Sequence, residues 1–253
     1  MKVTILGCGT SGGVPIIGDR WGNCDPKNPK NERLRSSALL EMGDKKVLID
    51  TSPDLRYQLL REKVPTIDAV LYTHAHADHT HGLNDLCLVS RFKEAEIPVY
   101  GDKPTLDALR QSFGYAFHNP DNAHYQPFLT AHEIEYTPFE VFGRTVEPFE
   151  QDHGLIKSLG FKIGDFAYST DVCALKPEVL DFLKGIDTWV VDCLRYEPHT
   201  THSHLALTLE WIAYVKPRRA ILTHLSPLLD YDTLCQELPA GVEPGYDRLT
   251  LEI

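Results

Sequence analysis

The sequence predicts an α/β fold in which two mixed β-sheets pack face to face and helices cover their outer surfaces. Each half of the chain opens with short strands and continues into alternating strands and helices, an order typical of layered sheets with helices outside. With 253 residues, of which 42% are hydrophobic and 24% charged, the chain can bury a large core. Since no repeat, low-complexity segment or linker divides it, we expect a single domain over 1–253.

Three short strands are predicted at the start of the chain, over 2–7, 37–42 and 46–50. A Gly-, Asn- and Pro-rich excursion over 12–35 and a tight Gly43-Asp44 turn connect them, because such residues favour turns and loops. The first half then predicts a helix over 53–63, a strand over 69–73, a helix over 82–93, a strand over 98–100, a helix over 103–113 and an irregular segment to about 133.

The second half repeats this pattern of strands followed by strand–helix alternation. Short apolar runs predict the strands, and apolar periodicity with a proline near the first turn predicts the helices. The expected elements are strands over 145–149, 158–163 and 166–169, a helix over 177–184, a strand over 188–192, a helix over 205–215, a strand over 219–223 and a final hairpin.

Charge and composition narrow the class of protein. The formal net charge is −11, which argues against a general nucleic-acid-binding surface, since such surfaces are usually basic. The negative net charge does not exclude a small anionic substrate that is held locally by metal ions. The amino-terminal apolar stretch is short for a signal peptide, and no run reaches membrane-spanning length. Six cysteines without a Cys-x-x-Cys pair are expected to be reduced. We therefore expect a cytoplasmic protein that does not bind a membrane.

The most informative motif is the segment 74–79, which reads His-Ala-His-Ala-Asp-His. It directly follows the apolar run 69–72, so it is expected where a buried strand ends. Imidazole nitrogen and carboxylate oxygen suit zinc, manganese or iron. In an extended segment His74 and His76 point the same way, while the following turn brings Asp78 and His79 around a second point. The motif therefore predicts ligands for two metal ions.

Further metal-capable side chains follow predicted strands elsewhere in the chain. They are Asp50, His153, Asp171 and His224. Any one of them alone is more simply explained as a hydrogen-bonded polar residue at a loop. Their recurrence after the histidine-rich motif predicts that they gather around the same centre.

The order of these residues resembles the metallo-β-lactamase superfamily, whose fold is a four-layer αββα sandwich. The resemblance implies two divalent metal ions, zinc or manganese, with these ligands: His74, His76 and His153 for the first, Asp78, His79 and His224 for the second, and Asp171 bridging both. It also implies that Asp50 braces the ligand loop from outside, and that Asp78 counts among the catalytic residues. An aspartate at 171 favours a phosphodiesterase-type hydrolase, in which two metals activate water and clamp the phosphoryl oxygens.

Three other segments resemble one branch of that superfamily. They are the Gly-rich run 7–15, the segment 190–195 and the segment 201–205. Together they resemble the phosphodiesterases of the carbon–phosphorus lyase pathway, which open 5-phosphoribosyl 1,2-cyclic phosphate. They resemble more loosely ribonuclease Z and a pyrroloquinoline quinone biosynthesis relative. The resemblance differs at one point: the cysteine cluster that holds a structural zinc in those phosphodiesterases is reduced here to Cys24. One thiolate does not complete a tetrahedral site, so we expect no third zinc.

The same segments provide candidates for proton transfer and substrate binding. His202 is expected to protonate the leaving oxygen, because a positioned acid assists an alkoxide leaving group, with His204 as its rival. Backbone amides in a Gly-rich turn can face an anion. The expected substrate-binding residues are Thr10, Ser11 and Gly12 of that turn, together with His204.

The irregular segment 113–133 is expected to form a lid over the metals. Its aromatic side chains are expected to pack within the lid, with stacking on a base as the alternative. They are Tyr115, Phe117, Tyr125 and Phe128. The histidines at 118, 124 and 132 belong to the same stretch, and His81 is expected to be structural.

The sequence thus predicts a metal-dependent hydrolase, most directly a phosphodiesterase of a small cyclic phosphate or a nucleotide-like phosphodiester. The expected partner is a small phosphorylated molecule and no large nucleic acid, with a homodimer left open. Ribonuclease Z-like tRNA processing is an alternative, but the long basic arm that such enzymes use to grip tRNA is not visible between the motifs. Two more alternatives remain: an acyl ester or lactone hydrolase, and a metal-binding accessory protein without turnover.

Overall fold

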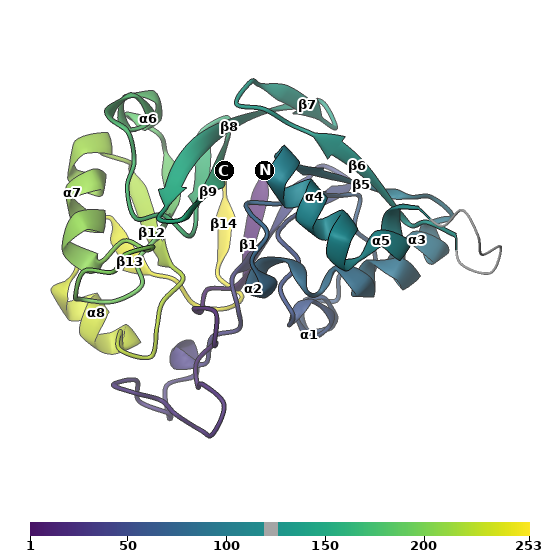
Figure 1. Cartoon of the computed structure of the whole chain (residues 1–253). Coiled ribbons are helices and arrows are strands. Elements are labelled where there is room, and N and C mark those ends of the chain that lie inside the picture. The colour runs from purple at the N-terminus through teal and green to yellow at the C-terminus, as the bar shows by residue number, and fades with distance from the viewer. Residues whose placement is uncertain (119–125) are drawn as a thin grey trace.

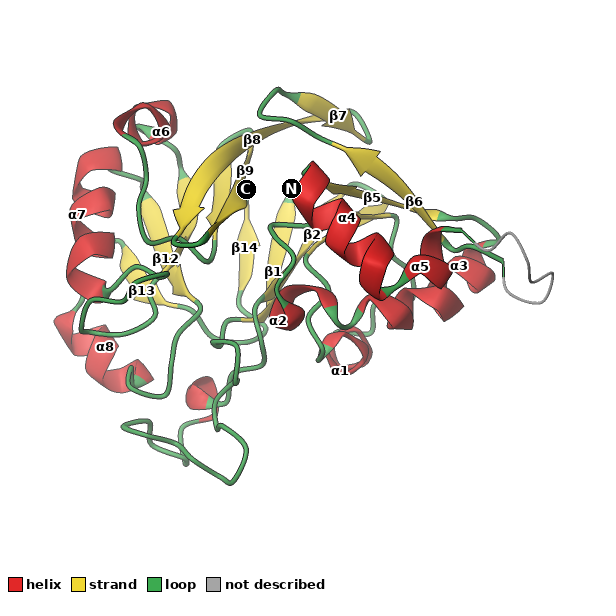
Figure 2. Cartoon of the chain, in the orientation of Figure 1, coloured by secondary structure: helices red, strands yellow, loops and turns green. Residues whose placement is uncertain are grey.

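The computed structural model describes residues 1–118 and 126–253. Over these residues the chain forms two seven-stranded sheets that lie side by side in Figures 1 and 2. The first sheet, in spatial order, contains β14 (Thr250–Glu252), β1 (Lys2–Gly7), β2 (Ser37–Met42), β3 (Lys45–Ile49), β4 (Ala69–Leu71), β5 (Ile97–Gly101) and β6 (Leu129–Glu133). The second contains β13 (Val242–Pro244), β12 (Arg219–Thr223), β11 (Thr188–Asp192), β10 (Phe166–Ser169), β9 (Ile156–Ile163), β8 (Arg144–His153) and β7 (Phe139–Val141).

The inner faces of the two sheets share one hydrophobic core. Successive side chains of a strand point to opposite faces, so in β2 Leu40 faces the second sheet while Leu39 faces outward. Phe161 and Val190 meet this inner core from the second sheet. The arrangement confirms the predicted packing of sheet against sheet.

Helices cover both outer faces, which completes the four-layer αββα sandwich (Figure 1). The first sheet carries α1 (Leu55–Arg61), α3 (Leu86–Lys93), α4 (Lys103–Ser112) and α5 (Gly114–Phe117). The second carries α6 (Pro177–Leu183), α7 (Leu205–Val215) and α8 (Tyr231–Glu237). Within residues 1–118 and 126–253, no helix combines the length and apolar character needed to cross a membrane.

Parallel pairing determines where the functional loops lie. β3 to β6 are parallel neighbours, and so are β10 to β13. Strands buried on both faces are nearly continuously apolar, as in β4 and β11. Because parallel strands end at the same edge, the loops that follow them gather there.

The carboxyl terminus differs from the predicted hairpin. Asp230 caps α8 by accepting a hydrogen bond from the Thr233 amide at 2.9 Å. After α8, β13 joins β12 in the second sheet, whereas β14 pairs antiparallel with β1 in the first. The two final strands thus belong to different sheets, because β13 pairs with the preceding strand β12, whereas the partner of β14 is β1 at the other end of the chain.

The segment predicted as an irregular lid also differs. It contains α5 and the edge strand β6, which pairs with β5 in the register Ile97 opposite Leu129. Phe117 and Phe128 pack into the outer core of the first sheet, and the Tyr115 hydroxyl donates to Asn84 Oδ1 at 2.9 Å. The lid expectation is therefore wrong for Phe117 and Phe128, which lie in the outer core. Tyr115 is partly exposed and packs against Phe128 of the same segment, with ring centroids 6.2 Å apart.

The remaining predictions on that segment and its neighbours have mixed outcomes. Tyr125 and His124 lie outside the described residues. His132 stacks on Tyr100 with ring centroids 4.9 Å apart. His81 is exposed and packs edge-on against Phe113. The helix predicted over 82–93 is divided into a 3-10 turn, Leu83–Asp85, and α3, and β8 extends beyond its predicted end to His153.

A buried arginine holds the long amino-terminal excursion in place. The Arg33 guanidinium donates to the carbonyl oxygens of Ser226 (3.2 Å) and Leu229 (2.8 Å) and to Asn31 Oδ1 (3.1 Å). It also lies 3.8 Å from Cys24 Sγ. The loop is therefore tied to the segment after β12 by hydrogen bonds, at the place where the resemblance would put a structural zinc.

Candidate metal centre

The centre lies where strands of both sheets end. Asp50 follows β3, His74 lies three residues after β4, and His224 follows β12. Asp50, Asp171 and His224 have φ angles of 62°, 55° and 58°, a left-handed conformation that is uncommon for residues other than glycine. Such conformations cluster at functional sites, where the surrounding structure holds them.

One group of possible ligands lies around His74 and His76, at the start of the histidine-rich motif. The donor atoms of His74, His76, His153 and Asp171 lie within 4.8 Å of one another. His153 Nε2 is 3.2 Å from His76 Nδ1 and 3.5 Å from Asp171 Oδ2, while His74 Nε2 is 3.7 Å from the same oxygen. His74 and His153 therefore face one oxygen of Asp171, and His76 lies beside His153.

A second group converges on the other oxygen of Asp171. Asp171 Oδ1 lies 3.1 Å from His79 Nε2 and 3.5 Å from His224 Nε2. Asp78 Oδ2 lies 3.3 Å from His79 Nε2 and 3.6 Å from His224 Nε2. The structure thus brings together all seven side chains predicted as ligands, in two groups that share Asp171. Their role as ligands stays a prediction.

Outer hydrogen bonds fix which ring nitrogen faces the centre. His79 Nδ1 donates to Asp50 Oδ2 at 2.7 Å. The Thr73 hydroxyl also donates to that oxygen at 2.8 Å, so it accepts from His74 Nδ1 at 2.9 Å. His153 Nδ1 donates to the Thr201 carbonyl at 2.6 Å. In all three rings Nε2 is therefore the nitrogen that faces the centre, as metal-binding histidines require.

Buried atoms without partners test whether the site fits a cation. Among the described residues, Nε2 of His74, His79 and His224 is buried and has no hydrogen bond. An unsatisfied buried polar atom is costly, and native structures contain few. Two divalent cations, one in each group, would satisfy all three atoms, and this set of imidazole nitrogens and carboxylate oxygens suits zinc or manganese. The residues therefore fit a metal site.

The electrostatics of the protein residues point in the same direction. Burial alone would raise the pKa of Asp171, but the imidazoles of His224, His79 and His74 outweigh it and hold that pKa well below its usual range. Burial would lower the pKa of His224, but the carboxylates of Asp171, Asp78 and Asp192 together outweigh it and raise the pKa to about 9. The carboxylates thus attract positive charge into the centre, which protons or metal ions can supply.

His202 lies beside the two groups without belonging to the predicted ligands. Its ring stacks on His224 with centroids 4.6 Å apart, and its Nε2 is 3.8 Å from Asp171 Oδ2. Its side chain is 12% exposed. Nδ1 hydrogen-bonds Asp192 Oδ2 at 3.3 Å, so Nε2 faces the centre.

Asp192 is not among the site residues predicted from the sequence. In the structure this buried carboxylate ends β11, orients His202, and accepts from the Ser203 amide at 3.1 Å. One carboxylate oxygen of Asp192 lies within 4.8 Å of ring nitrogens of His202 and His224. The signal that identified Asp50 and Asp171, a carboxylate at the carboxyl end of an apolar strand, was present here too.

The predicted substrate-binding residues lie in two places. The Thr10 amide donates to the Leu225 carbonyl at 3.2 Å, so the Gly-rich loop runs beside His224. Ser11 and Gly12 are exposed on that loop. His204 is the half-buried N-cap of α7 and makes no side-chain capping bond. Contact with substrate stays a prediction for all four.

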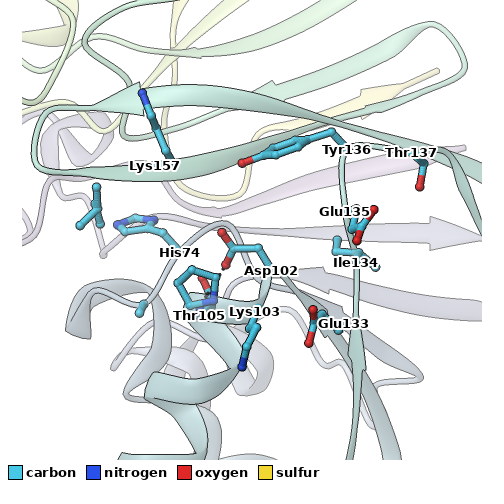
Figure 3. A pocket seen from close by; sticks show the side chains of 13 residues that line it. His74, Asp102, Lys103, Thr105, Glu133, Ile134, Glu135, Tyr136, Thr137 and Lys157 are labelled. Carbon is cyan, nitrogen blue, oxygen red and sulfur yellow. Dashed lines mark hydrogen bonds between the residues drawn. The ribbon is translucent and has the colours of Figure 1, made fainter.

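A cleft of about 840 Å³ adjoins the centre at His74 and Ala75 (Figure 3). The start of α4, the chain after β6 and the β8–β9 hairpin form its other walls. The residues from those elements are Asp102, Lys103, Pro104, Thr105, Glu133, Ile134, Glu135, Tyr136, Thr137, Ile156 and Lys157. No pattern in the sequence predicts this cleft.

The fold and the centre define a class of protein. Residues 45–225 match the family described as the β-lactamase superfamily domain. The chain belongs to the metallo-β-lactamase superfamily, as its histidine and aspartate order predicted. Membership and the His/Asp clusters support the use of divalent metal and a hydrolytic activity.

Individual relatives are similar over different lengths. A crystal structure of a diphosphatase from the PhnP family superimposes with a TM-score of 0.91 and 35% identity, covering 100% of this chain and 97% of the other. An octanoyltransferase of Porphyromonas gingivalis is 35% identical over 98% of this chain but 51% of its own length. The anti-Pycsar protein Apyc1 of Paenibacillus harenae is 33% identical over 67% of this chain and 74% of its own length. The chain thus spans about half the length of the first of these curated relatives.

Proposed function

We propose that the protein is a phosphodiesterase that requires two divalent metal ions, zinc or manganese. The observation that carries this proposal is Asp171, whose two oxygens face separate groups of histidines. The similarity to a diphosphatase supports phosphoryl chemistry. The proposed substrate is a small cyclic phosphate or a nucleotide-like phosphodiester.

The residues proposed to hold the first ion are His74, His76 and His153, and those proposed for the second are Asp78, His79 and His224, with Asp171 shared. When bound, the two ions supply water activation and neutralise charge on the phosphoryl oxygens. Asp50 keeps His79 oriented, because it accepts the hydrogen bond from Nδ1.

His202 is proposed to hold the proton that the leaving oxygen needs. Asp192 accepts a hydrogen bond from His202 Nδ1, which keeps the ring oriented with Nε2 toward the centre. In the protonated ring, Nε2 carries the proton that is transferred. A positioned acid of this kind contributes about 10²–10⁴-fold to the rate.

Hydrolysis of bis-p-nitrophenyl phosphate tests the proposal against p-nitrophenyl acetate. Each substrate is assayed with chelator-treated protein and after addition of Mn²⁺ or Zn²⁺. We expect metal-dependent release of p-nitrophenolate from the phosphodiester. Release from the acetate alone would contradict the proposal and support an acyl hydrolase.

The acyl hydrolase is the second candidate because a 35% identical relative is named an octanoyltransferase. That name describes a protein about twice as long as the match, since the match covers 51% of it. A metal-loaded protein inactive on both substrates would support a third candidate, an accessory protein that binds metal without turnover.

A further inference from the structure

The cleft beside the metal centre is placed to receive the part of a substrate that lies beyond the phosphate. One end contains His74 and Ala75 of the histidine-rich motif. The opposite walls come from the start of α4 and from the chain that connects β6 to β7 (Figure 3). A phosphodiester held at the centre would direct one of its alcohol groups into this space.

The two lysines of the cleft are already paired with carboxylates outside it. Lys103 Nζ lies 2.6 Å from Asp107 Oδ2, and Lys157 Nζ lies 3.0 Å from Asp152 Oδ2. Neither aspartate lines the cleft. In Figure 3 both ammonium groups point out of the cleft, so they do not provide a site for a second anion.

The carboxylates of the cleft are not paired in this way. Asp102, Glu133 and Glu135 line it, and in the described parts of the chain none of the three forms an ion pair. Asp102 Oδ1 accepts from the Thr105 amide at 3.0 Å, which caps α4 and leaves Oδ2 available. The cleft therefore carries negative charge.

An aromatic ring and aliphatic side chains complete the walls. Tyr136 is 48% exposed, and Figure 3 shows its ring across the cleft from Asp102. Ile134 and Ile156 add apolar surface. Carboxylates beside an aromatic face attract a cation by charge and by its interaction with the ring.

We propose that the cleft binds an ammonium group carried by an alcohol portion of the phosphodiester substrate. The inference rests on the proposed phosphodiesterase activity of the adjoining centre. It also disfavours 5-phosphoribosyl 1,2-cyclic phosphate, because a second phosphate in the cleft would meet unpaired carboxylates.

A pair of substrates with the same shape tests the charge preference. p-Nitrophenyl phosphorylcholine carries a trimethylammonium group, and p-nitrophenyl 3,3-dimethylbutyl phosphate carries a tert-butyl group in its place. In the metal-loaded protein we expect kcat/KM to be higher for the cationic substrate by about tenfold, mainly through KM. Equal kcat/KM values would overturn the proposal.

Substitutions in the cleft test whether its carboxylates cause the preference for the cationic substrate. Glu135→Gln and Asp102→Asn each remove one charge, and asparagine retains the capping oxygen of α4. The ratio of the two kcat/KM values is expected to fall about threefold in each variant. Glu210→Gln, on the exposed face of α7, is the matched control and should retain the wild-type ratio. An unchanged ratio in both cleft variants would contradict the assignment.

A binding measurement separates this proposal from the proposed function. Choline and 3,3-dimethylbutan-1-ol are titrated into the metal-loaded protein by calorimetry. If neither phosphodiester is hydrolysed, the phosphodiesterase proposal fails, while binding of choline that weakens in Glu135→Gln still supports an ammonium site. No difference between choline and the neutral alcohol would refute the site whatever the activity.

Discussion

Asp171 is the residue on which both halves of the centre depend. Asp171→Ala removes the oxygens that face the two histidine groups, so we expect the loss of one or both metal ions together with phosphodiesterase activity. Elemental analysis of the purified variant measures the first effect and the phosphodiester assay the second.

Asp165→Ala, in the exposed turn between β9 and β10, is the control and should retain metals and activity. A variant at 171 that retained two ions and wild-type turnover would contradict the shared-ligand arrangement.

His202 should affect proton transfer and leave metal binding intact. His202→Ala is expected to slow cleavage of an alkyl phosphodiester by about 10²–10⁴-fold. The effect should be much smaller for p-nitrophenolate, a leaving group that needs no proton. His204→Ala is the comparison, since His204 lies two residues away.

Equal losses on the two substrates would remove His202 from this role, as would a loss confined to the variant at 204. Metal content, determined in parallel, must stay at the wild-type value for the comparison to hold.

Arg33 determines the stability of the amino-terminal loop. Arg33→Leu leaves the carbonyl oxygens of Ser226 and Leu229 without these donors, and each unsatisfied buried group costs about 1–3 kcal/mol. We expect a clear decrease in the free energy of unfolding, measured with urea. Lys27→Leu, in an exposed part of the same loop, should have little effect.

Cys24→Ser tests whether the same loop binds a metal ion. Because Cys24 Sγ contacts Arg33 and the Leu229 carbonyl, the exchange should shift the melting temperature little and leave the metal content unchanged. Loss of a bound zinc in this variant would show that the loop has a structural metal site after all.

The elements that were predictable from sequence are those buried on both faces. β4 is a continuous apolar run and the centre of β11, 189–191, is apolar too, so their type and position followed from the pattern of apolar residues. β6 has one fully buried residue, Leu129, in five and pairs with β5 on one side, which leaves no periodic signal. The local sequence predicts a hairpin for β13 and β14, because the pairing of Val3 with Leu251 depends on strands at opposite ends of the chain.

The centre was predictable because several of its candidate ligands lie at or just beyond the ends of recognisable strands, whereas the cleft was not. Asp102 and Glu135 follow β5 and β6, and nothing local distinguishes them from solvated carboxylates. Their significance depends on the β8–β9 hairpin, which provides the facing wall. Contacts between the two halves of the chain are set by tertiary structure, and a local pattern does not contain them.

At the scale of the whole molecule, Asp247 joins the beginning of the chain to its end. Its carboxylate accepts from the amides of Cys8 (3.2 Å) and Leu34 (3.0 Å) and from Arg61 Nη1 (3.1 Å). These partners come from the end of β1, the amino-terminal loop and α1. The side chain is 6% exposed, so its protonation is linked to the folding of all these segments.

Burial raises the pKa of Asp247 to about 6, although Leu34 and Arg61 act in the opposite direction. In the unfolded chain an aspartate titrates near 3.9. A pKa that is higher in the folded state gives a contribution to stability that is fully present below about pH 3.9 and is lost as the pH rises through about 6. The full contribution is about 3 kcal/mol, of which about 2 kcal/mol is lost between pH 4.5 and 7.5.

Asp247→Asn lacks this titration, so comparison with the wild-type protein cancels the titration of every other group. From pH 4.5 to 7.5 the free energy of unfolding of the wild-type protein should fall relative to that of the variant by about 2 kcal/mol. Urea unfolding of both proteins at the two pH values measures the difference. A difference that is constant with pH would mean that Asp247 is already ionised in the folded protein at pH 4.5, and that its amide and Arg61 hydrogen bonds outweigh the effect of burial.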